Sequence, residues 1–173
     1  MNNVFVIADT HFGHRKIIEF EADNRPFATI EEHDAELVDR WNSTVNKQDT
    51  VWHLGDVLFG SHCFELLGKL NGQKHLVMGN HDHYPTARYL EHFKRLHGAA
   101  ELKGYILTHV PVDDGQFWRY KGNFHGHLHS KSISDSMSHF CVSAEHHFLM
   151  PIRLMAAIEL IEEAKSTGNK HRG

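Results

Sequence analysis

The sequence predicts an α/β fold, and two observations lead to this prediction. Five short apolar segments each run into polar residues that can bind a metal ion or carry a proton, and segments of helical periodicity alternate with most of them. Short apolar runs rich in β-branched and aromatic residues indicate buried strands, and strands that alternate with helices indicate an α/β protein. Open α/β sheets place their ligands beyond the carboxyl ends of strands. We therefore expect five strand ends to meet at one site: Asp9-Thr10-His11, Gly55-Asp56, Gly79-Asn80-His81-Asp82, His109 and Gly126-His127-Leu128-His129.

In the first half of the chain, residues 3–8 and 51–54 are predicted strands, and a short helix is expected over residues 16–20. Pro26 indicates a loop, because proline lacks a donor and biases its predecessor away from helix. Thr29 is expected to cap the next helix, with Glu32 completing a capping box. Residues on one face of this helix are expected to be buried: Leu37, Val38, Trp41 and Val45.

In the second half, Ser61 is expected to cap a helix that buries Phe64, Leu67 and Leu70, before a strand over residues 74–78. Pro85 suits the first turn of a helix, whose inner face would carry Leu90, Phe93 and Leu96 and which would end at Gly98. Further expectations are two strands or a hairpin about Gly104, a loop over residues 113–122, strands over 123–125 and 140–143, and a last helix through Leu154, Ile158 and Ile161, with a first segment (152–154) that could be a strand.

The 173-residue length indicates one domain over residues 1–166, followed by a flexible tail over residues 167–173. A net charge of −4 argues against a protein that grips duplex DNA through its phosphates, but it is compatible with a small phosphoester substrate. We expect no signal peptide and no membrane span, and hence a cytoplasmic protein. Cys63 and Cys141 are expected to be reduced, buried thiols. Oligomeric partners are left open.

Histidine is unusually frequent, at 18 of 173 residues, and several histidines follow apolar strands. Asp9 and His11 are two residues apart and would point the same way in an extended segment. Any one such pair is more often structural than functional. The ordered set, however, supplies oxygen and nitrogen donors without a thiolate, which suits Mn²⁺, Fe or Zn²⁺ better than Ca²⁺. Two ions sharing a carboxylate such as that of Asp56 would suit displacement at phosphorus.

The motif order resembles that of the calcineurin-like metallophosphoesterase superfamily, and the resemblance spans residues 9–129. It implies two packed mixed β-sheets flanked by helices, a four-layer α/β/β/α sandwich, with a centre of two divalent transition-metal ions, of which Mn²⁺ is the first choice and Fe, Ni or Zn the alternatives. The implied roles are Asp9, His11 and His129 on the first ion, Asp56 between the two, and Asn80, His109 and His127 on the second.

The resemblance also implies that His81 is not a ligand but faces the scissile phosphate. There it would stabilise developing charge and protonate the leaving oxygen, while a hydroxide activated by the two ions attacks phosphorus. Asp56 would take part in catalysis through that bridging position. The serine/threonine protein phosphatases carry an acidic residue where this chain has Phe59, so protein phosphatase activity is not expected. The opening motif is similar to small bacterial and phage phosphoesterases, for which a phosphodiester is the favoured substrate.

Four further residues are candidates for substrate contact: His14, Arg15, Arg25 and Arg119. Each has a structural alternative, such as a surface ion pair or a helix cap. Trp118 and Tyr120 lie beside Arg119 and could stack on a base, although burial that pins the loop is the favoured interpretation. His53 and His125 are expected to support the ligands, and His146 and His147 to lie outside the ligand set.

The sequence therefore predicts a metal-dependent phosphodiesterase acting on a nucleotide-like or other small substrate. One alternative is a phosphomonoesterase or a nuclease acting on short nucleic acid. Another, of a different class, is a binding scaffold that keeps the fold without its chemistry, as a retromer subunit of this superfamily does. A scaffold is free to replace His81 or the ligands, whereas every such position is filled here.

Overall fold

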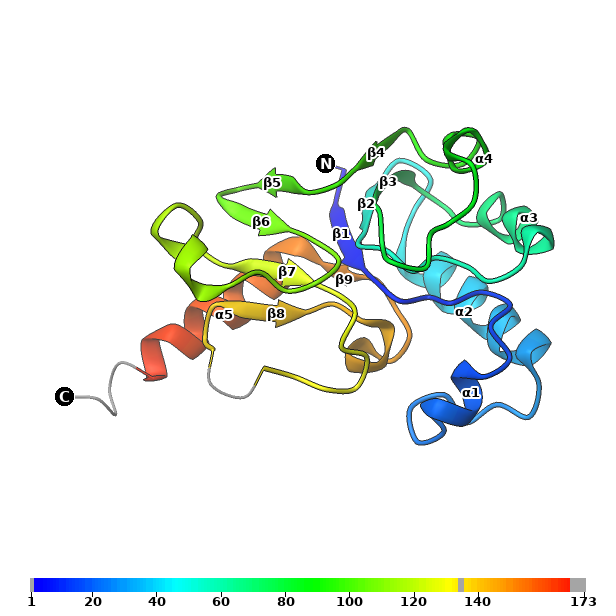
Figure 1. Cartoon of the computed structure of the whole chain (residues 1–173), viewed down its shortest axis with the longest axis horizontal. Coiled ribbons are helices and arrows are strands. Elements are labelled where there is room, and N and C mark those ends of the chain that lie inside the picture. Colours follow the sequence, from blue (N-terminus) through cyan, green and yellow to red (C-terminus); the bar gives the residue numbers. More distant parts are fainter. Residues whose placement is uncertain (1, 134–135, 169–173) are drawn as a thin grey trace.

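The computed structural model describes residues 2–133 and 136–168, and it confirms the α/β prediction with two mixed sheets and flanking helices (Figure 1). The first sheet has the order β4-β3-β2-β1-β9, in which only β9 runs antiparallel to its neighbour. The second has the order β5-β6-β7-β8, in which only β5 is antiparallel. The strands are β1 (Val4–Ile7), β2 (Thr50–His53), β3 (Gln73–Val77), β4 (Arg95–His97), β5 (Ala100–Leu102), β6 (Tyr105–Leu107), β7 (Asn123–His125), β8 (His139–Cys141) and β9 (Ile152–Arg153).

Five α-helices and three short 3₁₀ turns connect these strands within the described residues. They are α1 (Ile17–Phe20), α2 (Ile30–Thr44), α3 (Phe64–Leu67), α4 (Thr86–Leu90), α5 (Leu154–Gly168), η1 (Ser61–Cys63), η2 (Asp114–Trp118) and η3 (Ala144–His147). The predicted cap of α2 is confirmed, because the Thr29 hydroxyl accepts the backbone N–H of Glu32 at 3.2 Å. The Glu32 carboxylate accepts from the N–H of Ala28 rather than from that of Thr29, so the reciprocal half of the capping box is displaced by one residue.

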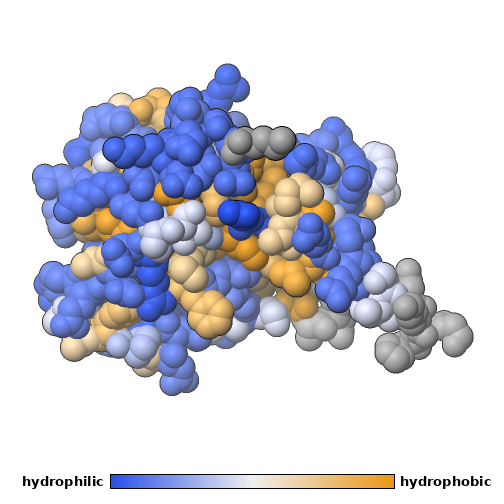
Figure 2. All heavy atoms as spheres, turned by 180° about the vertical axis from the view of Figure 1, so that it is seen from behind, coloured by the Kyte–Doolittle hydropathy of each residue, from blue (hydrophilic) through white to orange (hydrophobic). Residues whose placement is uncertain are grey.

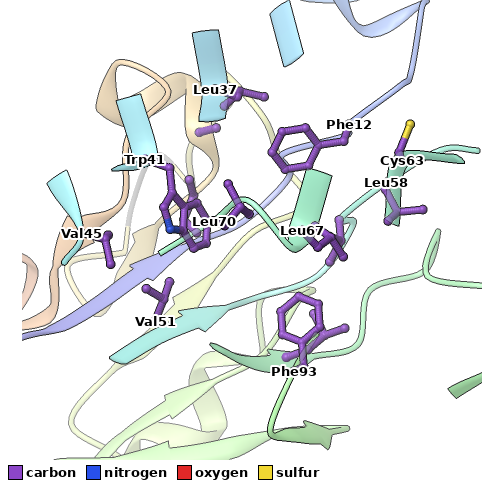
Figure 3. Packing of buried hydrophobic residues seen from close by; sticks show 14 of the residues in the cluster. Phe12, Leu37, Trp41, Val45, Val51, Leu58, Cys63, Leu67, Leu70 and Phe93 are labelled. Carbon is purple, nitrogen blue, oxygen red and sulfur yellow. The ribbon is translucent and has the colours of Figure 1, made fainter. Parts of the chain in front are cut away.

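One apolar core lies between the first sheet and the helices α2 to α4. Figure 3 shows Leu37, Trp41 and Val45 on the predicted face of α2, packed with side chains from β2, α3 and the segment before β4. Each such fully buried side chain contributes about 1.5–3 kcal/mol relative to an exposed one. A second core lies between the two sheets, where α5 contributes Leu154, Ala157 and Ile161. Ile158, the third predicted position on α5, packs at the edge of this core and is only partly buried.

Two predictions for the middle of the chain are wrong. Ser61 does not cap a helix: it is the first residue of η1, and the preceding position is Gly60, whose φ of 108° suits glycine. The helix after Pro85 ends at Leu90, which is 53% exposed, and Tyr89 is buried in its place. Leu96 lies not on that helix but in β4, where it pairs with Leu76 of β3. This segment is therefore a strand because it pairs with the edge of β3, although its apolar spacing also fits a helix.

The remaining elements agree with the sequence more closely. β5 and β6 form the predicted hairpin, with Lys103 and Gly104 both at positive φ in its turn. The predicted loop over residues 113–122 contains η2, and the segment at 152–154 is both strand and helix start. Helix α5 includes residues 167 and 168 of the predicted tail, and residues 169–173 lie outside the described part. Both cysteines are free, Cys63 buried and Cys141 partly exposed.

The surface seen from behind is mostly hydrophilic, with apolar side chains gathered near its middle (Figure 2). Among the residues that the structure describes, no helix is both long and apolar enough to cross a membrane.

Asp82 ties the loop after β2 to the loop after β3. Its carboxylate accepts the backbone N–H groups of Asp56, Val57 and Gly79 at 2.8–3.0 Å, and the Tyr89 hydroxyl lies 3.4 Å away. The residue is only 6% exposed, so these bonds replace water almost completely. The sequence motif contained Asp82, but no role for it was predicted.

We expect Asp82→Asn to lower the free energy of unfolding by about 2–3 kcal/mol, because the amide nitrogen cannot accept a backbone N–H and leaves at least one buried donor unpaired. Urea denaturation of the metal-free protein measures this. The exposed Asp23→Asn is the matched control and should change stability by less than about 0.5 kcal/mol. Equal stability of the two variants would contradict the linking role of Asp82.

Candidate metal centre

The carboxyl ends of strands from both sheets meet along one seam. Ala8, directly after β1, pairs with Ser143: its N–H donates to Val142 and its carbonyl accepts from Ala144. A second link joins the sheets where Nδ1–H of His109 donates to the carbonyl of Leu54 at 2.8 Å. The loops after β1, β2, β6 and β8 are therefore neighbours. The sequence predicted this for the first three loops but not for the loop after β8.

The first group of donors contains Asp9, His11 and His129, which each place a ligand atom within 4.8 Å of the other two. Nε2 of His11 lies 3.9 Å from Oδ1 of Asp9. Donors about 2.0–2.3 Å from one ion lie roughly 3–4 Å from each other. These are the three residues that the sequence grouped on the first ion.

The second group contains Asp9, Asp56 and His109. Nε2 of His109 lies 3.4 Å from Oδ2 of Asp56 and 2.9 Å from Oδ1 of Asn80, and 3.3 Å from Nδ1 of His127. Oδ2 of Asp56 is also 3.8 Å from Nε2 of His11. The Asp56 carboxylate therefore lies between the two groups, and all seven residues predicted as donors come together. Asp9 reaches both groups as well, which the sequence did not indicate.

The residues fit a pair of divalent cations. Oδ1 of Asp9 and Nε2 of His11 are buried without a hydrogen-bond partner among the described residues. A buried polar atom left in this state costs about 1–3 kcal/mol, and ligation by a cation would satisfy both atoms. The donor set is carboxylate, imidazole and amide, which suits Mn²⁺, Fe, Ni²⁺ or Zn²⁺.

Burial shifts the proton affinity of the same two residues. It raises the pKa of Asp9 to about 6 and lowers the pKa of His11 well below its usual range. His11 is consequently a neutral imidazole near pH 7, which is the form that binds metal.

Five of the seven donors have left-handed backbone conformations. This region is uncommon for residues other than glycine and costs of order 1–3 kcal/mol each. Such conformations cluster at sites where the surroundings hold a side chain in a required direction. The five are Asp9 (φ 56°), His11 (51°), Asp56 (56°), His127 (71°) and His129 (52°).

Two motif glycines give the carboxylates room. A Cβ at Gly79 would lie 2.3 Å from Oδ1 of Asp56, and a Cβ at Gly126 would lie 2.6 Å from Oδ2 of Asp9. Any larger residue would displace the carboxylate that it touches. This close approach is the physical reason for a glycine before Asn80 and before His127.

His81 lies at the open side of the centre, with its side chain 44% exposed. Its backbone N–H donates to Oδ1 of Asp56 at 2.9 Å, and its Nε2 is 4.0 Å from Oδ2 of the same carboxylate. Phe59 lies beside it, with ring centroids 5.0 Å apart, and stacks on His14 at 4.0 Å. The imidazole is thus placed by a backbone hydrogen bond and an aromatic contact, where the protein phosphatases use an acidic partner.

The four candidates for substrate contact have different positions. His14 lies at the centre, with its ring 5.3 Å from that of His11. Arg15 is 80% exposed, lies 3.4 Å from Glu31 and lines a groove that none of the donors lines. Arg25 is fully buried, and its N–H donors have partners, so it cannot reach a substrate. The structure thus brings one of the four, His14, to the centre.

Arg119 lies away from the centre. The next residue but one, Lys121, donates its N–H to Gly104 in the β5–β6 turn, at the amino end of β6, whereas the donors follow the carboxyl ends (Figure 1). Trp118 is 83% exposed, so the expectation that it is buried to pin the loop is wrong. The loop is held instead by Phe117 and Asp114, which contact His139.

The other histidines occupy supporting positions. His53 is buried, and its Nε2 lies 2.9 Å from the hydroxyl of Thr10, between two donors in sequence. His125 is also buried and donates from Nδ1 to Gly126. His146 and His147 contact backbone carbonyls of Lys131 and Cys141 and belong to neither donor group.

Two residues at the centre were not predicted. The Ser143 hydroxyl donates to Oδ2 of Asp9 at 2.6 Å, and Oε1 of Glu145 accepts from Nδ1 of His129 at 3.0 Å. Both follow β8, whose carboxyl end therefore carries polar residues like the other five. Their position at or just after the end of a predicted strand was the signal that could have identified them, but neither residue lies in a motif.

A groove lies elsewhere, between α2 and the η1–α3 segment. It has a volume of about 740 Å³ and is lined by residues such as Arg15, Glu31, Val38, Leu66 and Lys69. None of the seven donors lines it. The candidate metal centre is recognised by the chemistry of its side chains and not by the size of a groove.

Two relatives are similar to this chain over most of its length. The uncharacterized protein MJ1445 of Methanocaldococcus jannaschii is 32% identical over 178 residues, covering 95% of this chain and 94% of the relative. The Gene 66 protein of Mycobacterium phage L5 is 30% identical over 171 residues, covering 77% of this chain and 80% of the relative.

A crystal structure of the protein of unknown function AQ665 from Aquifex aeolicus has the same fold. Its TM-score is 0.76 at 22% identity, over 92% of this chain and all (100%) of that one. The family described as calcineurin-like phosphoesterase matches residues 3–164, nearly the whole described chain, and the chain belongs to this family.

Proposed function

We propose that the protein is a phosphodiesterase that depends on two divalent transition-metal ions. The observation that carries the proposal is the position of the Asp56 carboxylate between two donor groups, with the open imidazole of His81 4.0 Å away. Asp9, His11 and His129 would hold one ion, and Asn80, His109 and His127 the other, with Mn²⁺ as the first choice. When bound, the ions would supply Lewis acidity and a nucleophilic water at neutral pH.

His81 has the position needed for a general acid. The backbone N–H of His81 donates to the carboxylate of Asp56, and this bond fixes the distance between His81 and the donors. The ring is open to solvent on one side, where a substrate can approach. In this pose Nε2–H would donate a hydrogen bond to a phosphoryl oxygen and then transfer its proton to the leaving oxygen.

The charges near the centre favour a diester over a monoester. A monoester brings a second negative charge, for which a guanidinium is a common partner. Arg25 is buried with its donors paired, and Arg15 lies 3.4 Å from Glu31. A phosphomonoesterase and a nuclease acting on short nucleic acid are the alternatives within enzymes. The −4 net charge of the chain argues against duplex nucleic acid.

Aromatic rings beside His81 favour a substrate with a planar group, such as a nucleotide. His14 stacks on Phe59, and Phe20 of α1 lies edge-on to His14 with 68% of its surface exposed. Exposed aromatic rings next to a phosphate site are stacking surfaces for bases. His14 and Phe20 are therefore the proposed substrate contacts, and Arg15, Arg25 and Arg119 are not.

A non-catalytic scaffold is the alternative of another class. Its function would need neither ions nor His81, so it would have no reason to bury Asp9 and His11 with unpaired donor atoms. The test is hydrolysis of bis-p-nitrophenyl phosphate and of p-nitrophenyl phosphate by metal-stripped protein supplied in turn with Mn²⁺, Ni²⁺, Zn²⁺ or Mg²⁺. Metal-dependent cleavage of the diester is expected, and preference for the monoester would favour the phosphatase alternative. Cleavage of neither ester would favour the scaffold.

We expect His81→Ala to lower turnover of the diester by roughly 10²–10⁴-fold, because general acid catalysis contributes about that much. Metal content, measured by inductively coupled plasma mass spectrometry, should stay unchanged. His83→Ala, an exposed histidine two residues away, is the matched control and should keep full turnover. Unchanged turnover of His81→Ala would remove this residue from catalysis.

We expect Asp56→Asn to reduce the metal content from two ions per chain to one or fewer. The neutral amide oxygen is a weaker bridging ligand than the Oδ2 atom of a carboxylate, and the amide nitrogen cannot accept the N–H of His81. Metal content and turnover should fall together. A fully loaded and active Asp56→Asn protein would end the bridging assignment.

We expect Phe20→Ala to raise KM for a nucleotide diester by about fivefold, or roughly 1 kcal/mol of lost stacking, and to leave a dialkyl phosphodiester unchanged. Trp118→Ala, which removes another exposed aromatic side chain away from the centre, is the control. If Phe20→Ala raised KM equally for the nucleotide diester and the dialkyl phosphodiester, Phe20 would only support the fold.

A further inference from the structure

A buried carboxylate lies behind the metal centre. The side chain of Glu145, in η3, is 1% exposed, and its Oε1 contacts three donor atoms. It accepts hydrogen bonds from Nε of Arg25 at 2.8 Å and from Nδ1 of His129 at 3.0 Å, and Nη2 of Arg25 completes an ion pair at 2.7 Å. A buried charge is tolerated when it is paired and hydrogen-bonded in this way.

The bond to Glu145 determines which nitrogen of His129 is free. Oε1 is already surrounded by donors, so Nδ1 of His129 must carry a proton to contact it. Nε2 then keeps its lone pair, which a metal ligand requires. The His129 ring lies beside that of His11, with centroids 4.9 Å apart, and the residue belongs to the first donor group. Nε2 is the nitrogen that the bond to Glu145 leaves for an ion in that group.

Arg25 connects this carboxylate to the loop after β1. Its Nη2 also donates to the carbonyl of Asp9 at 2.6 Å, and its Nη1 donates to the carbonyl of Thr10 at 3.1 Å. The remaining Nη1 contact is Nε2 of His33, at 2.7 Å. Both carbonyls belong to the loop after β1, in which Asp9 and His11 have left-handed backbone conformations. One guanidinium thus joins the loop that carries two donors to the acceptor that orients a third.

A different use of the same residues is a further cation site, since Glu21, His129 and Glu145 also place ligand atoms within 4.8 Å of one another. The guanidinium of Arg25 argues against it, because a permanent positive charge already lies 2.7 Å from Oε1 of Glu145.

We propose that Glu145 is a positioning residue for the metal centre: it fixes the tautomer and direction of the His129 imidazole, and Arg25 couples it to the loop of Asp9 and His11. Such carboxylate–histidine–metal arrangements raise metal affinity without contacting the ion. The inference rests on the proposed function only in taking His129 as a ligand.

The test is the affinity of the full-length, metal-stripped protein for Mn²⁺, measured by competition with a fluorescent chelator. Glu145→Ala should weaken binding by about 10–100-fold, and Glu145→Gln, which keeps an acceptor for Nδ1–H, should restore much of it. Asp49→Asn is the matched control: it removes a buried carboxylate that caps a turn far from the centre, so it should lower the melting temperature without changing affinity.

If Glu145→Ala does not fold, the ring Nδ1–H proton of His129 in the Zn²⁺-loaded protein gives a second readout. Its NMR signal should move upfield in Glu145→Gln, because a neutral acceptor makes a weaker hydrogen bond. An unmoved signal, or Mn²⁺ affinity within twofold of wild type in both Glu145 variants, would overturn the inference. Failure of the wild-type protein to bind Mn²⁺ would instead overturn the proposed function.

Discussion

The arrangement of the two sheets at the centre depends on the hydrogen bonds that the Asp9 carboxylate accepts. Asp9 follows β1, an inner strand of the first sheet, and its Oδ2 accepts the backbone N–H of His127 at 2.9 Å and the hydroxyl of Ser143 at 2.6 Å, both beyond strands of the other sheet. Its Oδ1 remains free for an ion. One buried side chain thus closes the seam with one oxygen and offers the other to the site. The cost of burying it is visible in its raised pKa of about 6.

Strain and rigidity at the centre have the same origin. Most of the donors adopt left-handed backbone conformations, which persist only when neighbouring contacts hold them. Those contacts are backbone hydrogen bonds to buried charged groups: Asp82 holds the loop of Asp56, and Arg25 holds the loop of Asp9. Because these groups are fixed in the folded chain, little reorganisation is needed when a substrate binds.

The sequence was sufficient for the parts of the structure that local patterns determine. The strands that precede the donors were predicted because each is a short apolar run, and the donors because each follows such a run. Their order along the chain then identified the set. The sequence failed where tertiary contacts decide. Leu96 pairs with the edge of β3 instead of lying in a helix. Arg25 was predicted to lie in a loop but is buried, because carbonyl and carboxylate groups pair with its guanidinium. The carboxylate lies 120 residues away in sequence, so no local pattern indicates the contact. Glu145 was missed for the same reason, since nothing adjacent in sequence marks its contact with His129.

The measurement that tests the metal centre most directly is X-ray diffraction from crystals grown with Mn²⁺, recorded on both sides of the manganese absorption edge. We expect two anomalous peaks about 3.5–4 Å apart, with Asp56 between them, one beside His11 and His129 and the other beside Asn80 and His109. A single peak, or a peak among Glu21, His129 and Glu145, would contradict the assignment of the donors. The absence of any peak at saturating Mn²⁺ would contradict a metal-dependent activity altogether.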